Sequence, residues 1–436
     1  MTLPALAAAL LALAAPAPDP APVTEGNVTE ARVAGLTVLV KRLPNAELVT
    51  TQLHVRGGAR NWGAADAGVE ALAFRVATTG GTRQLDKEAF GRKLSSLGAE
   101  IVTTTGRDGS FIQGKGPLAG FEATFGLVAD CFLSPALPES EVALARDQRV
   151  LELQRQRENP DGALGLLVEA TLFKGHPYAN RPEGTPESVV NLNRTQLADH
   201  LARLREASRL LLVVVGDVDP GRVFALARQA FAGVPPGAWD PPPLPRPIFA
   251  TPALTSEARK LPTNYLQGMF VAPGPGAPDY PAARVATFAL GQRLFEEVRT
   301  KRNLSYAPGA RYDVAEGVSL AGIYVTAVEP DVTLPVMLGE LTRLKEQPIP
   351  DEELAGHKSV YRTRFLMSQE TTDGQATSLA RGLLLAGDWR YFDQLLARAA
   401  SVTAADVQAY ARTYASRLQF VLLGDPGKLD PKLTGY

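Results

Sequence analysis

Three positions on one predicted helix have the spacing of a zinc site without its ligands. The stretch AGVEALAFRVATTGGT, residues 67–82, carries apolar residues at the i, i+3 and i+4 spacing of a helix that faces a core, at Val69, Leu72, Ala73, Val76 and Ala77. The neighbouring face carries Ala71, Phe74 and Arg75, the spacing at which two histidines and a glutamate would converge on zinc. None of these side chains can hold a metal ion, so the sequence predicts a degenerate zinc helix.

No other group of residues offers clear hydrolytic chemistry. No two of the four histidines share a helical turn; they are His54, His176, His200 and His357. The single cysteine, Cys131, has apolar neighbours that favour a buried and inert thiol, and no GxSxG motif is present. An independent hydrolase that uses other residues is therefore a weak interpretation.

Composition and charge exclude several classes of partner. The chain has 45 basic and 46 acidic residues and a net charge of −1, so nothing points to nucleic acid or to an anionic membrane surface. Residues 1–20 hold an apolar run followed by small residues and are predicted to be a signal peptide, which implies a periplasmic or secreted protein. The alternative for this segment is a disordered Ala/Pro tail. No later segment approaches ~18 uninterrupted apolar residues, so no membrane span is expected.

The predicted helix belongs to the first of two similar halves. A proline-rich connector, PPGAWDPPPLPRP, has seven prolines in 13 residues and divides the chain. The runs TQLADHLARLREASRLLLVVVGD at 195–217 and TAADVQAYARTYASRLQFVLLGD at 403–425 align without a gap, and RENPDG upstream of the first matches SQETTDG upstream of the second. We infer that a whole structural unit is duplicated.

Each copy reads as a strand, then helices, then a final strand. The alternation of Val49, Thr51, Leu53 and Val55 with polar residues predicts the first strand, and residues 265–271 are its counterpart. The predicted fold class is α+β, with two homologous α/β-sandwich domains related by an internal duplication. The predicted domains are 28–234 and 252–436, joined by a linker at 235–251.

The arrangement resembles the pitrilysin/insulinase family of zinc metallopeptidases, in the branch of mitochondrial processing peptidase. The resemblance is carried by VRGGARNWGAADAGVEALAFRVATTGG, GHPYANRPEGTPESV, LLVVVGDVDP and LFEEVRTKRNLSYAPGARY, and it covers nearly all of the chain after the predicted signal. It implies that Ala71, Phe74 and Arg75 stand where the family has an HxxEH helix. It also implies that Glu152 stands at the distal zinc ligand; we interpret this glutamate as a solvated residue on a charged helix, and as a possible relic of the site.

A second element of the family lies in the other half. The resemblance implies that Arg299 and Tyr306, seven residues apart in VRTKRNLSY, grip substrate opposite the zinc. Arginine offers a rigid fork of donors for peptide carbonyls, and a tyrosine hydroxyl can donate to the oxyanion of a tetrahedral intermediate. The residues alone would also fit Arg299 as an exposed charge beyond an amphipathic helix and Tyr306 as a packed residue at a strand start.

The resemblance therefore implies a non-catalytic subunit of a two-chain zinc endopeptidase, without peptidase activity of its own. The chain itself is expected to hold no cofactor; the zinc and the HxxEH helix are expected in a partner subunit of the same family, and the substrate is expected to be a peptide or unfolded protein. The alternative is a stand-alone peptide-binding or scaffold pseudo-peptidase, with no peptidase partner.

Overall fold

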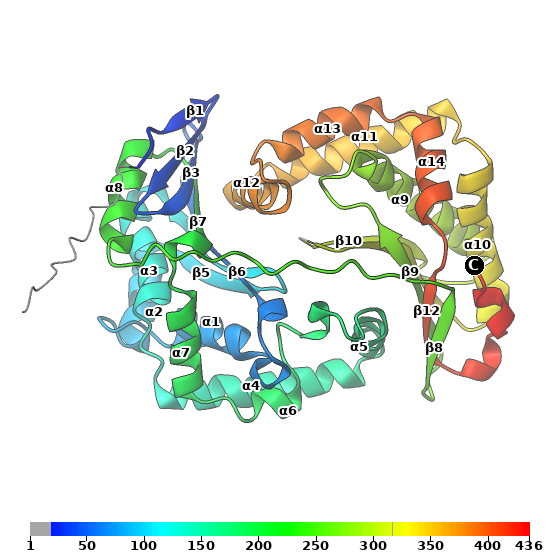
Figure 1. Ribbon diagram of the computed structural model, residues 1–436, viewed down its shortest axis with the longest axis horizontal. Helices are drawn as coiled ribbons and strands as arrows, with labels where there is room; N and C mark the ends of the chain where they lie inside the picture. The colour runs from blue at the N-terminus through cyan, green and yellow to red at the C-terminus, as the bar shows by residue number, and fades with distance from the viewer. Residues whose placement is uncertain (1–18, 316) are drawn as a thin grey trace, which may run out of the picture.

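The computed structural model describes residues 19–315 and 317–436 and has a mixed α/β fold built on two sheets (Figure 1). The predicted signal peptide falls almost entirely outside the described residues. The first sheet has seven strands in the order β1-β2-β3-β7-β4-β6-β5. Their bounds are β1 Val23–Glu25, β2 Val28–Val33, β3 Leu36–Arg42, β4 Leu48–Arg56, β5 Glu100–Thr105, β6 Gly109–Pro117 and β7 Leu210–Gly216.

The second sheet has five strands in the order β10-β11-β9-β12-β8. Their bounds are β8 Ala253–Ala258, β9 Asn264–Ala272, β10 Gly309–Val314, β11 Ser319–Ala327 and β12 Gln419–Gly424. The sheets share one topology: β3 and β7 are parallel, as are β8 and β12, and the next three strands on that side are antiparallel in both. Two similar α+β units related by duplication are therefore confirmed. The first sheet also includes β1, which lies before residue 28, where we predict the unit to begin.

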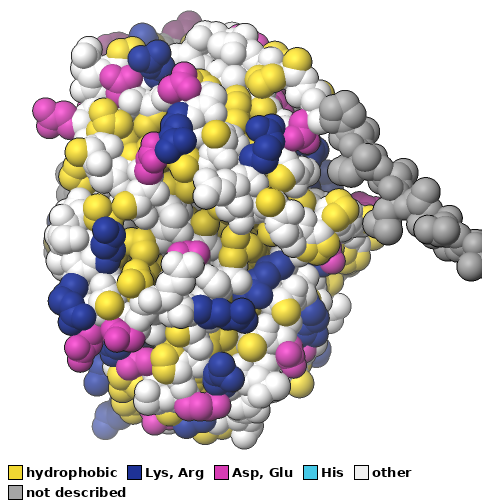
Figure 2. All heavy atoms as spheres, turned by 90° about the vertical axis from the view of Figure 1, so that its left-hand side faces the viewer, with side chains coloured by type: hydrophobic (Ala, Val, Ile, Leu, Met, Phe, Trp, Pro, Cys, Tyr) yellow, Lys and Arg dark blue, Asp and Glu magenta, His cyan; other side chains and the backbone are white. Residues whose placement is uncertain are grey.

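Helices follow one common order in the two halves, apart from α2 and α8, which occur in the first half and have no helix at the corresponding place among the described residues of the second. The first half contains α1 Val69–Thr79, α2 Lys87–Leu97, α3 Phe121–Leu133, α4 Glu139–Glu158, α5 Pro160–Leu172, α6 Pro186–Val189, α7 Arg194–Leu204 and α8 Pro220–Phe231. The second contains α9 Tyr280–Leu294, α10 Pro330–Glu346, α11 Asp351–Ser368, α12 Thr372–Ala386, α13 Tyr391–Ser401 and α14 Ala404–Tyr414. Basic and acidic side chains are interspersed on the outer face of the first half, in keeping with the balanced net charge (Figure 2).

Helices α5 and α12, which follow α4 and α11 in the two halves, begin in the same way. Asn159 caps α5 by accepting a hydrogen bond from the amide of Gly162 at 3.0 Å, and Thr371 caps α12 by accepting from Gly374 at 3.1 Å. In each pair a Cβ on the glycine would meet a carbonyl oxygen six residues earlier at under 2.5 Å, so only glycine fits. The two helix pairs therefore share one register, with Gly162 matched to Gly374.

One helix of each half packs on the sheet of the other half (Figure 1). Helix α5 packs on β9 and β12, and α12 packs on β4 and β7. The polar side of β4 faces α12: the Thr50 and Thr372 hydroxyls are 2.8 Å apart, and the Gln52 amide donates to Thr377 at 3.0 Å. Strand β4 alternates in sequence like a half-exposed strand, yet it is buried on both faces because a helix from the second half covers the polar face.

The segment between the sheets, from Pro235 to Pro252, contains no helix or strand and is mostly exposed. Several contacts fasten it to the first half, among them hydrogen bonds from the amides of Ala207 and Ser208 to the carbonyls of Pro235 and Pro236. The guanidinium of Arg209 lies 4.6 Å from the ring centre of Trp239, and the Pro245 carbonyl oxygen lies 2.7 Å from Nε2 of His176. His176 also accepts from the Tyr178 amide at 3.0 Å, so it shapes a loop.

We expect limited proteolysis to cut first within residues 235–252, because exposed backbone outside a hydrogen-bonded ladder fits a protease cleft. Chymotrypsin and elastase suit this test, since Arg246 is followed by Pro247 and trypsin would cut poorly there. Two fragments near half mass should appear on a denaturing gel. They should still co-elute in native gel filtration, because α5 and α12 interlock the halves. Early cuts inside either half would contradict the predicted domain boundary.

Candidate functional site

The degenerate zinc helix α1 meets α4 through an arginine. Nη1 of Arg75 donates to the two carboxylate oxygens of Glu152 at 2.9 and 3.1 Å, and Nη2 donates to Oε1 of Gln148 at 2.9 Å. Arg149 adds a second cation 3.3 Å from the Glu152 carboxylate. Two of the positions aligned with zinc ligands, 75 and 152, are thus in direct contact, and a guanidinium supplies the positive charge between the helices.

Glu152 differs in part from its predicted role. Its side chain is 44% exposed, as a solvated residue would be, but it is held by two arginines. The pairing could not be read from the charged pattern of α4, because Arg75 lies 77 residues away in the chain. A partly exposed pair of this kind contributes only about 0–1 kcal/mol to stability.

The other two degenerate positions belong to the hydrophobic core. Phe74 is fully buried, with its ring centre 6.3 Å from that of Phe132, and Ala71 is 4% exposed. A glutamate at position 74 would place a carboxylate in this core at a cost of several kcal/mol. Full restoration of an HxxEH helix therefore conflicts with the packing of the first half.

We expect the purified chain to bind no stoichiometric zinc, because Arg75 already supplies the positive charge that zinc would bring to Glu152. Metal analysis after dialysis against zinc and then metal-free buffer measures this. The double change Ala71→His and Arg75→His spares Phe74 and adds two ligands to Glu152, so it should raise zinc retention and serves as a positive control. One tightly held zinc per unaltered chain would contradict the prediction.

Arg299 and Tyr306 form a stacked pair in which Arg299 is partly exposed and Tyr306 is exposed. The guanidinium of Arg299 lies 4.1 Å from the ring centre of Tyr306 and 4.9 Å from that of Phe295. The Tyr306 side chain is 77% exposed, and its hydroxyl has no hydrogen-bond partner among the described residues. The interpretation that Tyr306 packs at a strand start is wrong, because it lies in the loop before β10 and faces solvent.

The backbone around this pair is tightly fixed. Helix α9 continues into a π-helical turn, Phe295–Thr300, whose Glu297 carboxylate accepts from Lys301 at 2.7 Å and from Arg302 at 2.5 Å. The hydrogen bonds from these two cations, that of Lys301 foremost, lower the pKa of Glu297. Asn303 takes a left-handed conformation with φ of 51° and turns the chain toward Tyr306. Glu297 is therefore paired with Lys301 and Arg302 within the loop. Arg299 forms no ion pair with a carboxylate among the described residues.

Sequence reasoning missed a buried polar cluster beside the degenerate helix. The Glu70 carboxylate accepts from Nε1 of Trp62 at 3.0 Å and from the hydroxyl of Ser110, and it lies 3.0 Å from Nε2 of His200. Glu70 is 3% exposed and His200 is fully buried. The signal in the sequence was a glutamate next to the apolar face of α1, but its partners lie as far as 130 residues away.

Two other chemical features of the chain can be placed. Cys131 is fully buried, and burial raises the pKa of its thiol to about 12, so it is an inert core residue as expected. The described residues contain no group of three or more His, Cys, Asp or Glu side chains that could hold a metal ion. Within the same residues, no helix has the length and hydropathy needed to cross a membrane.

Two family descriptions match the chain over adjoining segments. Residues 37–185 match "Insulinase (Peptidase family M16)" and residues 191–361 match "Peptidase M16 inactive domain". The chain belongs to the insulinase family. The word "inactive" applies to the second segment, whereas the loss of zinc ligands in this insulinase-family chain is read from Ala71, Phe74 and Arg75 in the first.

Relatives in the insulinase family match over most of the chain. An uncharacterized zinc protease of Mycobacterium leprae is 27% identical over 391 residues, which cover 86% of each chain. The mitochondrial-processing peptidase subunit beta of Saccharomyces cerevisiae is 22% identical over 413 residues, or 88% of each chain. A solved peptidase M16 inactive domain from Pseudomonas fluorescens superposes with a TM-score of 0.84 at 20% identity, over 91% of this chain and 98% of that one. This last likeness supports the fold alone.

Proposed function

We propose that this chain is the non-catalytic, substrate-binding subunit of a heteromeric zinc endopeptidase. The observation that carries the proposal is a contrast between the two halves. In the first, Arg75 and Glu152 bind each other where zinc would be held. In the second, Tyr306 is exposed and Arg299 partly exposed, and neither side chain has a hydrogen-bonding partner among the described residues. The chain keeps the groups that hold a substrate and lacks those that hold the metal.

The chemistry of the stacked pair suits a cleavage site completed by another chain. The Arg299 guanidinium can donate to a backbone carbonyl of an extended peptide, and the Tyr306 hydroxyl can donate to the oxyanion that develops at the scissile carbonyl. The 4.1 Å stack holds the two side chains in one arrangement before substrate arrives. Zinc, on an HxxEH partner subunit, would supply the activated water.

The comparisons support a subunit role without identifying the partner. One relative is named as a subunit, the beta chain of a processing peptidase, and similarity along most of the chain makes a related assembly a natural proposal. We further propose a peptide or unfolded protein as substrate and a periplasmic or secreted location, the latter from the apolar run at the start of the sequence.

The proposal is tested by reconstitution with an HxxEH chain of the same family, for example one encoded beside this gene. This chain alone should cleave no internally quenched peptide, and a mixture should cleave faster than the HxxEH chain alone. The two should co-elute in gel filtration. If this chain binds peptide but neither pairs with nor activates such a partner, the stand-alone scaffold interpretation replaces the proposal.

A further inference from the structure

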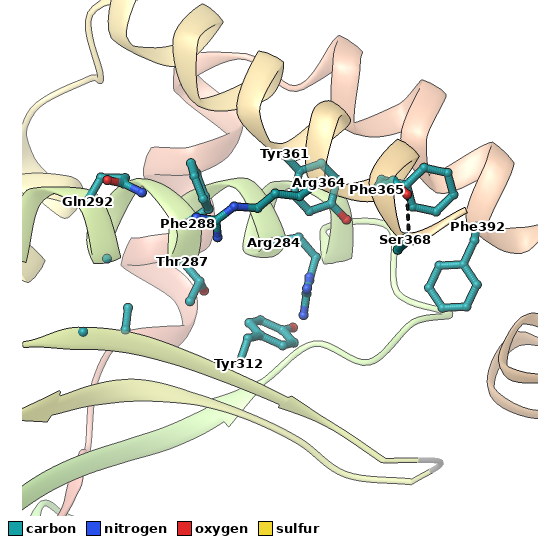
Figure 3. Close-up of a pocket in the computed structure, with 13 residues that line it drawn as sticks. Arg284, Thr287, Phe288, Gln292, Tyr312, Tyr361, Arg364, Phe365, Ser368 and Phe392 are labelled. Atoms are coloured by element: carbon teal, nitrogen blue, oxygen red, sulfur yellow. Dashed lines mark hydrogen bonds between the residues drawn. The ribbon is translucent and has the colours of Figure 1, made fainter. Parts of the chain in front are cut away.

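The second half has a pocket of about 490 Å³ between α9, β10, α11 and α13 (Figure 3). Two arginines, Arg284 of α9 and Arg364 of α11, line it together with the aromatic side chains of Phe288, Tyr312, Tyr361 and Phe392. Figure 3 draws the side chains of both arginines at the pocket, with Arg284 directed toward Tyr312. Among the described residues, no aspartate or glutamate lines the pocket.

This pocket occupies the same place in the second half as the degenerate zinc site in the first. Helix α1 packs against α4, β5 and α7, and α9 packs against α11, β10 and α14. The tetrapeptide RVAT occurs in both helices, at 75–78 in α1 and at 284–287 in α9, with valine and alanine buried in each copy. Arg284 is therefore the counterpart of Arg75.

The partner helices give a second correspondence. Since Gly162 of α5 is matched to Gly374 of α12, the residue ten positions before each glycine is also matched. That residue is Glu152 in α4 and Arg364 in α11. The arginine–glutamate pair that closes the site in the first half thus becomes two arginines in the second.

The two arginines of the pocket are not paired with a carboxylate in the described part of the chain. Arg284 and Arg364 form no ion pair with a described residue; their guanidiniums lie 5.2 Å from the ring centre of Tyr312 and 4.9 Å from that of Phe288. The nearby Glu353 of α11 is occupied by Arg293, at 2.7 and 3.0 Å, and by His357 at 3.2 Å. Asp313 follows Tyr312 in β10 and points to the opposite face of the sheet.

Arg284 is half-buried and Arg364 is exposed at the mouth of the pocket, and a like-charged pair of this kind attracts an anion from outside. Guanidiniums bind carboxylates through two parallel hydrogen bonds, and aromatic walls suit an organic group attached to the anion. We propose that this pocket binds a carboxylate of a peptide, with the adjoining side chain against the aromatic residues. The inference rests on the proposed function for the peptide nature of the ligand, and it adds an anchoring site separate from Arg299 and Tyr306.

The test uses the full chain without any partner and measures binding of fluorescent hexapeptides by anisotropy. Three peptides share one apolar sequence: a free acid ending in phenylalanine, its C-terminal amide, and an amide with an internal aspartate. If the carboxylate is the chain terminus, the free acid should bind at least tenfold more tightly than both amides. If it is an acidic side chain, the aspartate peptide should bind more tightly than the plain amide. Equal binding of all three overturns the proposal.

Matched variants assign the binding to the pocket. Arg364→Glu reproduces the arrangement of the first half, so Arg284 gains a carboxylate partner; we expect at least tenfold weaker binding and an unchanged or higher Tm. Arg284→Gln should also weaken binding, whereas Arg75→Gln, at the matched position of the first half, should not. Unchanged affinity in Arg364→Glu, or displacement of the peptide by equimolar inorganic phosphate, would refute the assignment. Because no peptidase partner is present, this result is independent of whether the reconstituted complex cleaves peptides.

Discussion

Tyr306→Phe should lower turnover in the reconstituted peptidase by roughly 10²–10³-fold, equivalent to about 2.7–4 kcal/mol of barrier. The substitution removes one hydroxyl, which has no partner in the chain among the described residues and is 77% exposed, so it is available to a reacting carbonyl. Assembly should be unaffected, because the ring and its stack with Arg299 remain. Steady-state kinetics at a fixed ratio of subunits, with gel filtration of the same samples, measures both effects.

Arg299→Ala should raise KM as well as lower kcat, since a guanidinium that grips backbone carbonyls contributes to binding in the ground state too. Arg203→Ala is the matched control: Arg203 also stacks on an aromatic ring, 5.7 Å from the centre of Trp62, but lies in the first half. It should leave both constants unchanged. A Tyr306→Phe complex that forms normally and cleaves at the unaltered rate would exclude the shared-site mechanism.

Glu70→Ala should reduce the free energy of unfolding by about 3–5 kcal/mol, the cost of removing one member of a buried, hydrogen-bonded charged cluster. The carboxylate is 3% exposed, and its loss leaves the Trp62, Ser110 and His200 side chains without this buried acceptor. Urea denaturation followed by far-UV circular dichroism gives the change in midpoint and slope.

The comparison variant is Glu152→Ala, which removes a carboxylate that is also bonded to a cation from another helix. Because Glu152 is 44% exposed and Arg75 is 27% exposed, the loss should stay below about 1 kcal/mol. Similar losses in the two variants would mean that burial does not govern the strength of these contacts in the first half, and the structural role given to Glu70 would fail.

Several features of the protein were determined by local sequence. The apolar spacing of α1 predicted which of its residues enter the core, because a helix repeats every 3.6 residues whatever covers it, and its five apolar positions are at most 1% exposed. The repeat between residues 195–217 and 403–425 predicted two copies of one unit, and the two sheets share a five-strand topology. The absence of zinc ligands at Ala71, Phe74 and Arg75 is likewise a fact of the sequence.

Only the tertiary structure decided what each of these faces meets. Strand β4 alternates like a half-exposed strand, but α12, more than 300 residues later, buries its polar side. The same holds for charges: Arg75 pairs with Glu152, while its counterpart Arg284 lines a pocket together with the like-charged Arg364. Periodicity reports the side of an element on which a residue lies, whereas a contact depends on which distant element packs there. The sequence could therefore predict that α1 lacks zinc ligands, but not what its arginine contacts. The packing of α4 against α1 produced an ion pair in the first half, and the packing of α11 against α9 produced an open cationic pocket in the second.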